Sequence, residues 1–423
     1  MMRPKASLLI ERIHTLVTCQ PTQVDPIGRI AGACVAVAGE HILAIGSMAD
    51  VISEVDASDA TRIDGSGKIL APGFVDSHTH LVFGGSRVQE YAARLTRTAS
   101  EAVAMGIPTG ILATVEMTRA ESAEVLTQSA LRRLDEMLQH GTTTVESKSG
   151  YGLSLAEELK ILQVNQRLDD HHPIDIISTF LGAHAAPPEI PHAEYVDLVI
   201  SEMIPAVAEA GLAKFCDVYC DEGYFSLEDS RRILEAARGA GLGLKIHVDQ
   251  YSDLGGGGLA AALAVVSADH LNYTGRDSAR RLARAGVTGV LMPLIDFAVQ
   301  HPRPFQARLL IEEGMTIALA TDFCPGCWAV SMPLMIQFAS RQHRLSPEEA
   351  FLAATAGGAR ALNLNDRGIL APGFLADIQM WDLPSFEDAF YRLGHNPVEI
   401  VIKRGKIVLD RRRNGGSTGP LNR

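Results

Sequence analysis

Histidine and aspartate side chains recur at the ends of short apolar runs in this sequence. His78 and His80 form an H-x-H pair, and His247 and Asp322 lie at the ends of two later runs. Residues two apart on a strand project to the same face, so the paired imidazoles can chelate a borderline cation such as zinc. An H-x-H pair alone also occurs by chance in loops. Three histidines with one carboxylate, however, predict a metal site that keeps one position for water.

Two further histidines, His184 and His270, also follow apolar runs. A single histidine after a strand is commonly a structural residue. At the rim of a metal site, an imidazole can instead polarise a carbonyl group or transfer a proton. Because both histidines end runs of the same kind as the metal candidates, we predict functional roles for them.

A C-x-x-C pair, Cys324 and Cys327, follows Asp322 directly. Such a pair suggests a redox dithiol or half of a zinc site. No second cysteine or histidine pair has partnering spacing, and Cys216 and Cys220 would have to reach across a barrel. We therefore predict that the C-x-x-C lines a pocket. The glycine-rich residues 253–263 lack a phosphate-loop fingerprint and predict a tight turn that opens a helix.

The elements that position these side chains alternate between strand and helix. Helical patterns with apolar residues at a spacing of three to four, and a closing glycine, separate eight apolar runs. Eight alternating units over about 300 residues favour a (β/α)8 TIM barrel over an open doubly wound sheet. The functional side chains of such barrels lie at the carboxyl ends of the strands. The eight runs are residues 73–83, 142–149, 174–184, 215–222, 244–250, 265–271, 287–294 and 316–323.

Both chain ends have β character, with short alternating runs separated by Gly, Asp and Pro. Neither end buries enough surface alone, because short strands need partners. We predict that residues 1–68 and 365–423 form one small composite β-sandwich domain, and that residues 69–364 form the barrel inserted between them.

Composition narrows the class of protein. The chain has 423 residues, of which 47% are hydrophobic and 21% charged, and its formal net charge is −12. The negative charge gives no electrostatic support for a nucleic-acid partner. No apolar run approaches the roughly 20 residues that span a bilayer, so no membrane role is expected. Six cysteines are too few for a secreted disulfide scaffold, which predicts a cytoplasmic protein.

Several motifs together resemble the imidazolonepropionase family of the amidohydrolase superfamily, whose enzymes act in histidine degradation. They run from about Ala71 to about Ala361, and the combination of the "GGSR", "SGYG" and "AHAAPPE" blocks is specific. The motifs are "APGFVDSHTHLVFGGSR", "TTTVESKSGYGL", "TFLGAHAAPPE", "KIHVDQYSDLGG", "SADHLNY" and "ALATDFCPG".

The resemblance implies one divalent metal per chain, zinc or else iron, and a homodimer. The metal ligands would be His78, His80, His247 and Asp322. The catalytic residues would be His270, Asp322, His184 and Gln250, and the substrate-binding residues Arg87, Tyr151, His184, Cys324, Gly326 and Cys327. We predict a single metal because no lysine is well placed to bridge two: Lys148 lies on the second run and Lys214 opens the fourth. Glu222, near the end of the fourth run, is the residue most able to add a second metal.

The implied reaction is hydrolysis of a cyclic small molecule that carries a propionate. Metal-bound hydroxide would attack the ring carbon between the two nitrogens, since a metal lowers the pKa of its water to roughly 7. Asp322 would accept the proton, and His270 would orient the water or stabilise the developing anion. Arg87 suits the propionate, because a guanidinium can grip a carboxylate with two hydrogen bonds; its alternative is a surface ion pair.

The sequence departs from the family pattern mainly on the substrate side. Cys324 replaces an Asn, Gln250 stands where some members have a Glu, and Asn272 replaces a Glu; residues 107–110 and 292–298 also differ. One alternative is therefore a paralogue that acts on a 2-thioxo-imidazolidinone propionate, releasing sulfide, or on a hydantoin propionate. Soft cysteine sulfurs would suit a sulfur substituent. A second alternative is a metal-free, non-catalytic barrel, against which the intact ligand set counts.

Overall fold

The computed structural model describes residues 3–413, which form two compact units. One unit contains the chain up to Val75, Glu136–Thr144 and the chain from Ser331 onward, and the other contains Asp76–Asp135 and Val145–Val330. Among the described helices, none is both long and apolar enough to cross a membrane.

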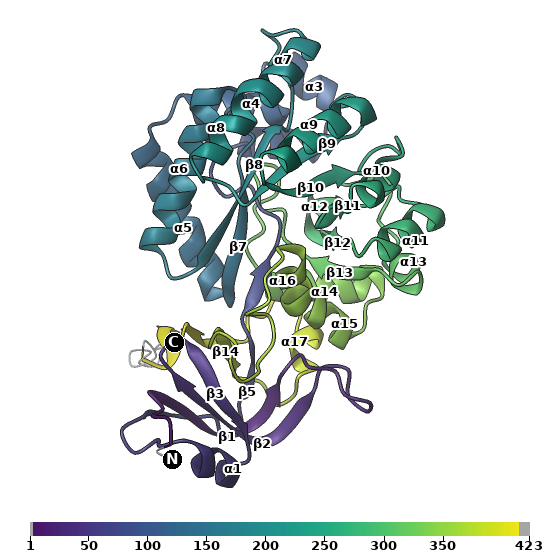
Figure 1. Cartoon of the computed structure of the whole chain (residues 1–423). Coiled ribbons are helices and arrows are strands. Elements are labelled where there is room, and N and C mark those ends of the chain that lie inside the picture. The colour runs from purple at the N-terminus through teal and green to yellow at the C-terminus, as the bar shows by residue number, and fades with distance from the viewer. Residues whose placement is uncertain (1–2, 414–423) are drawn as a thin grey trace, which may run out of the picture. The chain divides into compact units, whose positions relative to one another are not determined.

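Eight strands form the predicted barrel, which confirms the fold class. They lie side by side in chain order, and each neighbouring pair from the third strand to the eighth is parallel. The segments that directly follow the first and last strands are joined where His80 N–H donates to Phe323 O (2.8 Å) and Asp322 N–H donates to His78 O (3.0 Å). In Figure 1 the helices of this region surround the strands. The strands are β6 (Phe74–Asp76), β7 (Thr142–Lys148), β8 (Asp175–Ala183), β9 (Phe215–Cys220), β10 (Gly243–Val248), β11 (Ser267–His270), β12 (Thr288–Leu291) and β13 (Thr316–Leu319).

The first barrel strand is shorter than the sequence predicts. It ends at Asp76, so the H-x-H pair follows the strand instead of forming its tip. The carboxylate of Asp76 accepts hydrogen bonds from Thr321 N–H (3.0 Å) and Thr321 Oγ1 (2.6 Å) and joins the two chain segments at this point. An isolated bridge between Thr79 and Phe323 keeps the H-x-H segment next to residues 321–323.

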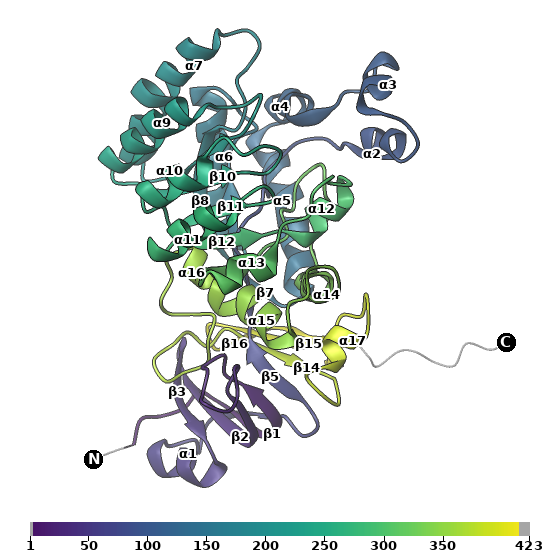
Figure 2. The same cartoon turned by 90° about the vertical axis from the view of Figure 1, so that its right-hand side faces the viewer.

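The helices of the barrel region begin and end at ordinary signals. Ser226 and Asp229 form a capping box at the start of α9, and Gly255, with a φ of 86°, opens α10 as the glycine-rich stretch predicts. Helices α2, α3 and α4 lie together on one side of this region in Figure 2. The helices are α2 (Val88–Arg94), α3 (Ala99–Ala104), α4 (Gly110–Arg119), α5 (Ala123–Gln139), α6 (Leu155–His171), α7 (His192–Leu198), the π-helix η1 (Val199–Met203), α8 (Ile204–Glu209), α9 (Leu227–Gly239), α10 (Gly256–Ala262), α11 (Arg276–Arg284), α12 (Pro293–Ala298) and α13 (Ala307–Glu312).

Strands from both chain ends form one mixed sheet, as the composition of the ends predicts. Its order is β16-β15-β14-β5-β1-β2-β3, and β4 pairs with β1. Because side chains alternate along a strand, Leu8 and Ile10 enter one apolar cluster while Leu9 enters another that includes Val51 of helix α1 (Met48–Glu54). The strands are β1 (Leu8–Val17), β2 (Arg29–Ala38), β3 (His41–Gly46), β4 (Thr61–Asp64), β5 (Ile69–Pro72), β14 (Ile378–Trp381), β15 (Val398–Lys403) and β16 (Lys406–Asp410).

The unit with the mixed sheet also contains the helices that follow Ser331. The sequence predicts that residues 331–364 belong to the barrel, and the domain boundaries at residues 68 and 364 stay predictions. The helices of this unit are α1 (Met48–Glu54), before Ser331, and α14 (Met332–His343), α15 (Pro347–Leu352), the π-helix η2 (Ala353–Gly357), α16 (Gly358–Ala361), α17 (Asp388–Tyr391) and the 3-10 helix η3 (Arg411–Arg413) after it.

Candidate metal centre

The predicted metal ligands and His270 form one buried cluster. Potential ligand atoms of His78, His247 and His270 lie within 4.8 Å of one another, as do those of His78, His80 and Asp322. Oδ1 of Asp322 is 3.6 Å from Nε2 of both His78 and His80. The two groups share His78, so the structure brings together all five residues that the sequence placed at four strand ends.

The unpaired atoms of this cluster include those that a metal would need. Among the described residues, His78 Nε2, His80 Nδ1, both ring nitrogens of His247 and His270 Nδ1 are buried and have no hydrogen-bond partner. Burial, together with neighbouring positive groups, lowers the pKa of His78, His80 and His270 well below its usual range. Neutral imidazoles offer a lone pair, and histidine nitrogens with one carboxylate oxygen are a donor set suited to zinc. The residues therefore fit a divalent cation.

Two carboxylates that the sequence analysis missed orient the histidines. Asp269 Oδ2 lies 2.6 Å from Nδ1 of His78, and Asp217 Oδ2 lies 3.0 Å from Nδ1 of His247. Such contacts fix the ring and direct its other nitrogen toward a metal. Their signal in the sequence is an aspartate inside an apolar run, because a charged side chain is rarely fully buried without a partner.

Lys148 is closer to the centre than its position on the second run suggested. Its side chain is fully buried, and Nζ lies 2.7 Å from Asp217 Oδ2 and 2.9 Å from Glu146 Oε1. It therefore contacts a carboxylate that orients a ligand. Glu222, by contrast, is exposed and lies in neither of the potential metal groups.

Several residues at the centre have a left-handed backbone. The φ angles are 54° at Asp249, 82° at His270, 61° at Leu271 and 46° at Asp322. Residues other than glycine rarely adopt this region, and each instance costs on the order of 1 kcal/mol or more. The surrounding structure holds these residues in place, which aims His270 and Asp322 at the same cluster as His78.

His184 and Tyr151 lie beside the metal candidates. The ring of His184 stacks on His80 with centroids 4.8 Å apart, and Tyr151 is 5.3 Å from His184. Nδ1 of His184 is 3.0 Å from the carbonyl oxygen of Gly150, and burial lowers the pKa of His184 to about 3. Both residues thus depend on the conformation of the loop at residues 149–153.

Glu158, at the start of α6, holds that loop and was not identified from the sequence. Its carboxylate accepts hydrogen bonds from the backbone N–H groups of Gly150 (2.9 Å), Gly152 (2.8 Å) and Leu153 (2.8 Å). The side chain is fully buried. Glu158 is the fourth residue of α6, and its position gives no sequence signal of this role because these three donors are backbone groups.

Gln250 is oriented by its neighbours. Tyr219 donates to its Oε1 at 2.5 Å, and its own backbone N–H donates to Asp221 Oδ2 at 2.9 Å. Since the side-chain oxygen is already engaged, the amide nitrogen of Gln250 is left as a donor. A glutamate at this position would have no such donor.

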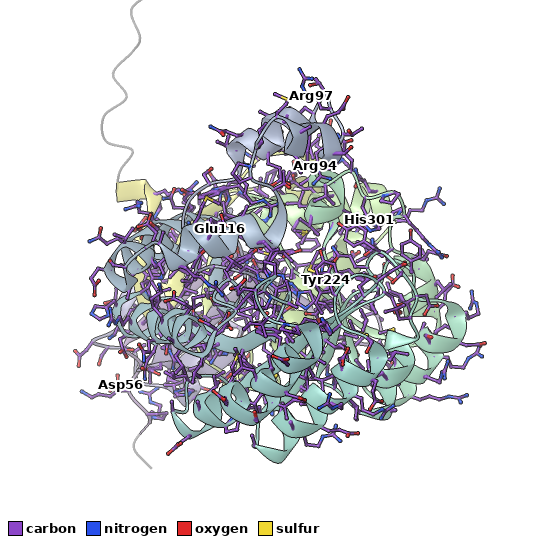
Figure 3. The ribbon with its side chains drawn as sticks, turned by 90° about the horizontal axis from the view of Figure 1, so that it is seen from above. Asp56, Arg94, Arg97, Glu116, Tyr224 and His301 are labelled. Carbon is purple, nitrogen blue, oxygen red and sulfur yellow. The ribbon has the colours of Figure 1, made fainter. Side chains whose placement is uncertain are left out.

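Two of the three guanidinium nitrogens of Arg87 already donate hydrogen bonds within the protein. Its Nε and Nη2 donate to Glu90 at 2.5 and 2.9 Å. Nη1 lies beside Gly326 instead, 3.6 Å from the position that a Cβ atom at this residue would occupy. Nη1 is therefore the donor group left for a ligand. A cavity of about 260 Å³ adjoins these residues, and Figure 3 labels Arg94 and Arg97 from its wall. The cavity is lined by Arg87, Glu90, Tyr91, Arg94, Leu95, Arg97, Thr98, Ala298, Val299, Gln300, Pro325 and Gly326.

The C-x-x-C forms a tight turn next to Arg87. Cys324 N–H donates to Cys327 O (3.1 Å) and Cys327 N–H donates to Cys324 O (3.0 Å). Both thiols are free and buried, and burial raises their pKa. They are thus neutral thiols, and Cys324 Sγ lies 3.7 Å from where a Cβ on Gly326 would stand.

Asn272, another departure from the family pattern, is paired with an acid. Its Nδ2 donates to Asp296 Oδ2 at 2.7 Å. Burial raises the pKa of Asp296 to about 7, although the bond from Asn272 opposes the shift. The sequence analysis did not single out Asp296.

Solved structures share the whole fold. An adenosine deaminase from Xanthomonas campestris with bound zinc superposes with a TM-score of 0.76 at 19% identity, covering 97% of this chain and 94% of that one. An atrazine chlorohydrolase from Arthrobacter aurescens complexed with zinc gives 0.71 at 18% identity, covering 97% of both chains. At these identities, the likeness shows the fold alone.

The sequence itself has much nearer relatives. The imidazolonepropionase of Geobacillus kaustophilus is 42% identical and that of Symbiobacterium thermophilum 44% identical, with 97% of this chain covered in each case. The matches span 99% and 98% of those relatives. A family model described as "Amidohydrolase family" matches residues 92–409. The chain therefore belongs to the amidohydrolase family and, within it, to the imidazolonepropionases.

Proposed function

We propose that this enzyme hydrolyses an imidazolone ring that carries a propionate tail, using one divalent metal, with zinc as the first choice. The observation that carries the proposal is the buried cluster of His78, His80, His247, His270 and Asp322, whose unpaired nitrogens face one another. The names of the relatives support this ring over the thioxo and hydantoin alternatives and over a non-catalytic barrel.

The chain offers a separate contact for each end of such a substrate. Nη1 of Arg87, next to Gly326, would bind the propionate carboxylate. The amide nitrogen of Gln250 would donate to the ring carbonyl, because Tyr219 engages its oxygen. Tyr151 and His184 would pack against the ring and exclude water from it.

Proton transfer falls to Asp322 and His270. When bound, the divalent cation supplies Lewis-acid polarisation and a lowered pKa for water. Oδ1 of Asp322 lies nearest His78 and His80, so Oδ2 is the atom left to take a proton from the attacking water. Water adds to the ring carbonyl carbon, the bond from that carbon to its ring nitrogen breaks, and the proton returns to the departing nitrogen. Attack at the carbon between the two nitrogens would give a formyl amide, whereas formiminoglutamate keeps that carbon bonded to both nitrogens. His270 would orient the water through its ring.

The proposal includes a cytoplasmic homodimer. The low cysteine count and the six free thiols support a reducing compartment. The dimer rests on the family resemblance.

The test is a panel of imidazolone-, hydantoin- and thiohydantoin-propionates given to purified enzyme of measured metal content. We expect fast loss of imidazolone absorbance with formation of formiminoglutamate, and loss of activity after chelation that added zinc restores. Sulfide release with a faster turnover of the thioxo compound would overturn the choice of ring. Full activity in protein without metal would overturn the metal centre.

A further inference from the structure

A layer of five fully buried charged side chains lies beside the metal candidates. Each side chain is 0% exposed, and together they form two ammonium groups facing three carboxylates. Isolated charges cannot be buried at such depth without partners. The layer consists of Glu146 and Lys148 on β7, Asp217 on β9, Lys245 on β10 and Asp269 on β11.

Two members of this layer touch the metal candidates through specific atoms. Asp269 Oδ2 is the oxygen next to His78 Nδ1, and Asp217 Oδ2 is the oxygen next to His247 Nδ1. Asp217 Oδ1 accepts the backbone N–H of His247 at 3.1 Å, which anchors that carboxylate. The two histidines present their unpaired Nε2 atoms on the opposite side of each ring.

Lys148 reaches the same two oxygens. Its Nζ lies 2.7 Å from Asp217 Oδ2 and 3.5 Å from Asp269 Oδ2. Burial alone would lower the pKa of Lys148, but Asp217, Glu146 and Asp269 raise it above its usual range, so the amine stays charged. The ammonium group of Lys148 thus lies between two carboxylates, each of which contacts a different histidine.

Lys245 is in the same layer but makes different contacts. Its Nζ lies 3.0 Å from Glu146 Oε1 and 3.0 Å from the carbonyl oxygen of Ser77, and 3.9 Å from Asp269 Oδ2. Among the described residues, its ion pairs are with Glu146 and Asp269 and not with Asp217. Of the two lysines in this layer, therefore, only Lys148 lies close to both Asp217 and Asp269.

We infer that Lys148 is a positioning residue that fixes His78 and His247 jointly, by holding the oxygen atoms of Asp269 and Asp217 against their Nδ1 atoms. Without the ammonium group, the two carboxylates would repel each other and turn away from the rings. The imidazole rings of both histidines would then lose their fixed orientation at the same time. The inference rests on the metal centre of the proposed function. It goes beyond that function because it makes the orientation of two metal ligands depend on one lysine.

The test compares Lys148→Met with Lys245→Met in the full chain. Each variant removes one buried ammonium group, so both lose stability, which thermal melting records. Zinc affinity is measured by competition with a chelator, and the visible spectrum of the cobalt-substituted protein reports ligand geometry. We expect zinc affinity to fall about 10- to 100-fold in Lys148→Met, the range seen when partners of metal ligands are removed, with an altered cobalt spectrum. We expect a fall at least several-fold smaller in Lys245→Met, with the wild-type spectrum.

Equal losses in the two lysine variants, or wild-type zinc affinity in Lys148→Met, would overturn the inference. If Lys148→Met does not fold, Asp217→Asn, Asp269→Asn and their double variant serve instead. A shared lysine predicts that the double variant loses less affinity than the product of the two single losses, and independent losses would contradict it. A wild-type chain that binds no divalent metal would overturn the proposed centre itself, which is a different result from either.

Discussion

Replacing Glu158 with glutamine should loosen the loop that carries Tyr151 while leaving the metal ligands in place. Oε1 of Glu158 accepts from Gly152 and Leu153, and Oε2 accepts from Gly150. A glutamine keeps one oxygen, so at least one N–H group of the loop would meet an amide NH₂ group, which donates and cannot accept. Glutamine and glutamate side chains have nearly the same size, so the substitution adds no steric change.

The magnitude follows from the bonds that are lost. A hydrogen bond to a charged group contributes about 1.5–3 kcal/mol. Burial raises the pKa of Glu158 in spite of its donors, so desolvation offsets part of that gain. We therefore expect a loss near the lower end, about 1.5 kcal/mol in the free energy of unfolding. For a unit of this size, that corresponds to a melting temperature lower by roughly 3–6 °C.

The assay combines thermal melting, metal content and steady-state kinetics. We expect full metal content, a lower melting temperature, and a kcat/KM reduced about tenfold because Tyr151 and His184 move. The matched control is Glu157→Gln at the preceding residue of α6, whose ion pair with Lys160 is partly exposed and contributes at most about 1 kcal/mol. Wild-type melting and kinetics in Glu158→Gln would refute the reasoning. An equal effect of Glu157→Gln would show that helix charge, and not the loop, is responsible.

Three further predictions concern the centre and its surroundings. His247→Ala should lose the metal while His270→Ala keeps it and loses turnover, as elemental analysis beside an activity assay would show; metal loss in His270→Ala would make that histidine a ligand. Cys324→Asn should change the ratio of kcat/KM for imidazolone- and thiohydantoin-propionate by roughly ten- to a hundredfold in favour of the imidazolone, with metal retained; an unchanged ratio would remove Cys324 from the specificity argument. Asp296 has a folded pKa of about 7 against an ordinary value of 3.8, so the unfolded chain binds fewer protons between these values and the free energy of unfolding should fall as pH rises from about 4 to about 7. Asp296→Asn should flatten that fall in urea titrations at pH 5 and pH 7.5, and an equally steep fall in the variant would assign it to other groups.

The barrel and the metal ligands could be predicted from the sequence because their signals are local. Each run of apolar residues marks a strand, and parallel strands of a barrel bring their carboxyl ends to one rim, so His247 and Asp322 could be placed together although 75 positions separate them in the numbering. The end of β6 was less predictable. Asp76 takes its hydrogen bonds from Thr321, a partner that no local pattern reveals.

The residues that orient the site could not be predicted, because their partners are distant in the sequence or belong to the backbone. Lys148 was predicted to be poorly placed to bridge two metals, and no role was assigned to it. Its partner Asp217 lies on a different strand, so their contact leaves no local pattern in the sequence. Glu158 accepts from three backbone N–H groups, which carry no residue signature. Arg87 was expected to grip a carboxylate through two donors. Its pairing with Glu90 engages two donor nitrogens, Nε and Nη2, an arrangement that the sequence spacing allows but does not single out.

The left-handed backbone at His270 and Asp322 restricts which variants of this enzyme can be made at all. Valine, isoleucine and threonine have a branched Cβ that collides with the chain in this conformation, so libraries at these two positions would be depleted of them whatever their chemistry. Asparagine and aspartate tolerate the conformation best among side chains that can bind a metal. Redesign of the centre for another cation would therefore draw on a short list of residues set by φ. An exchange of His270 for asparagine or aspartate would test a new ligand without also straining the chain.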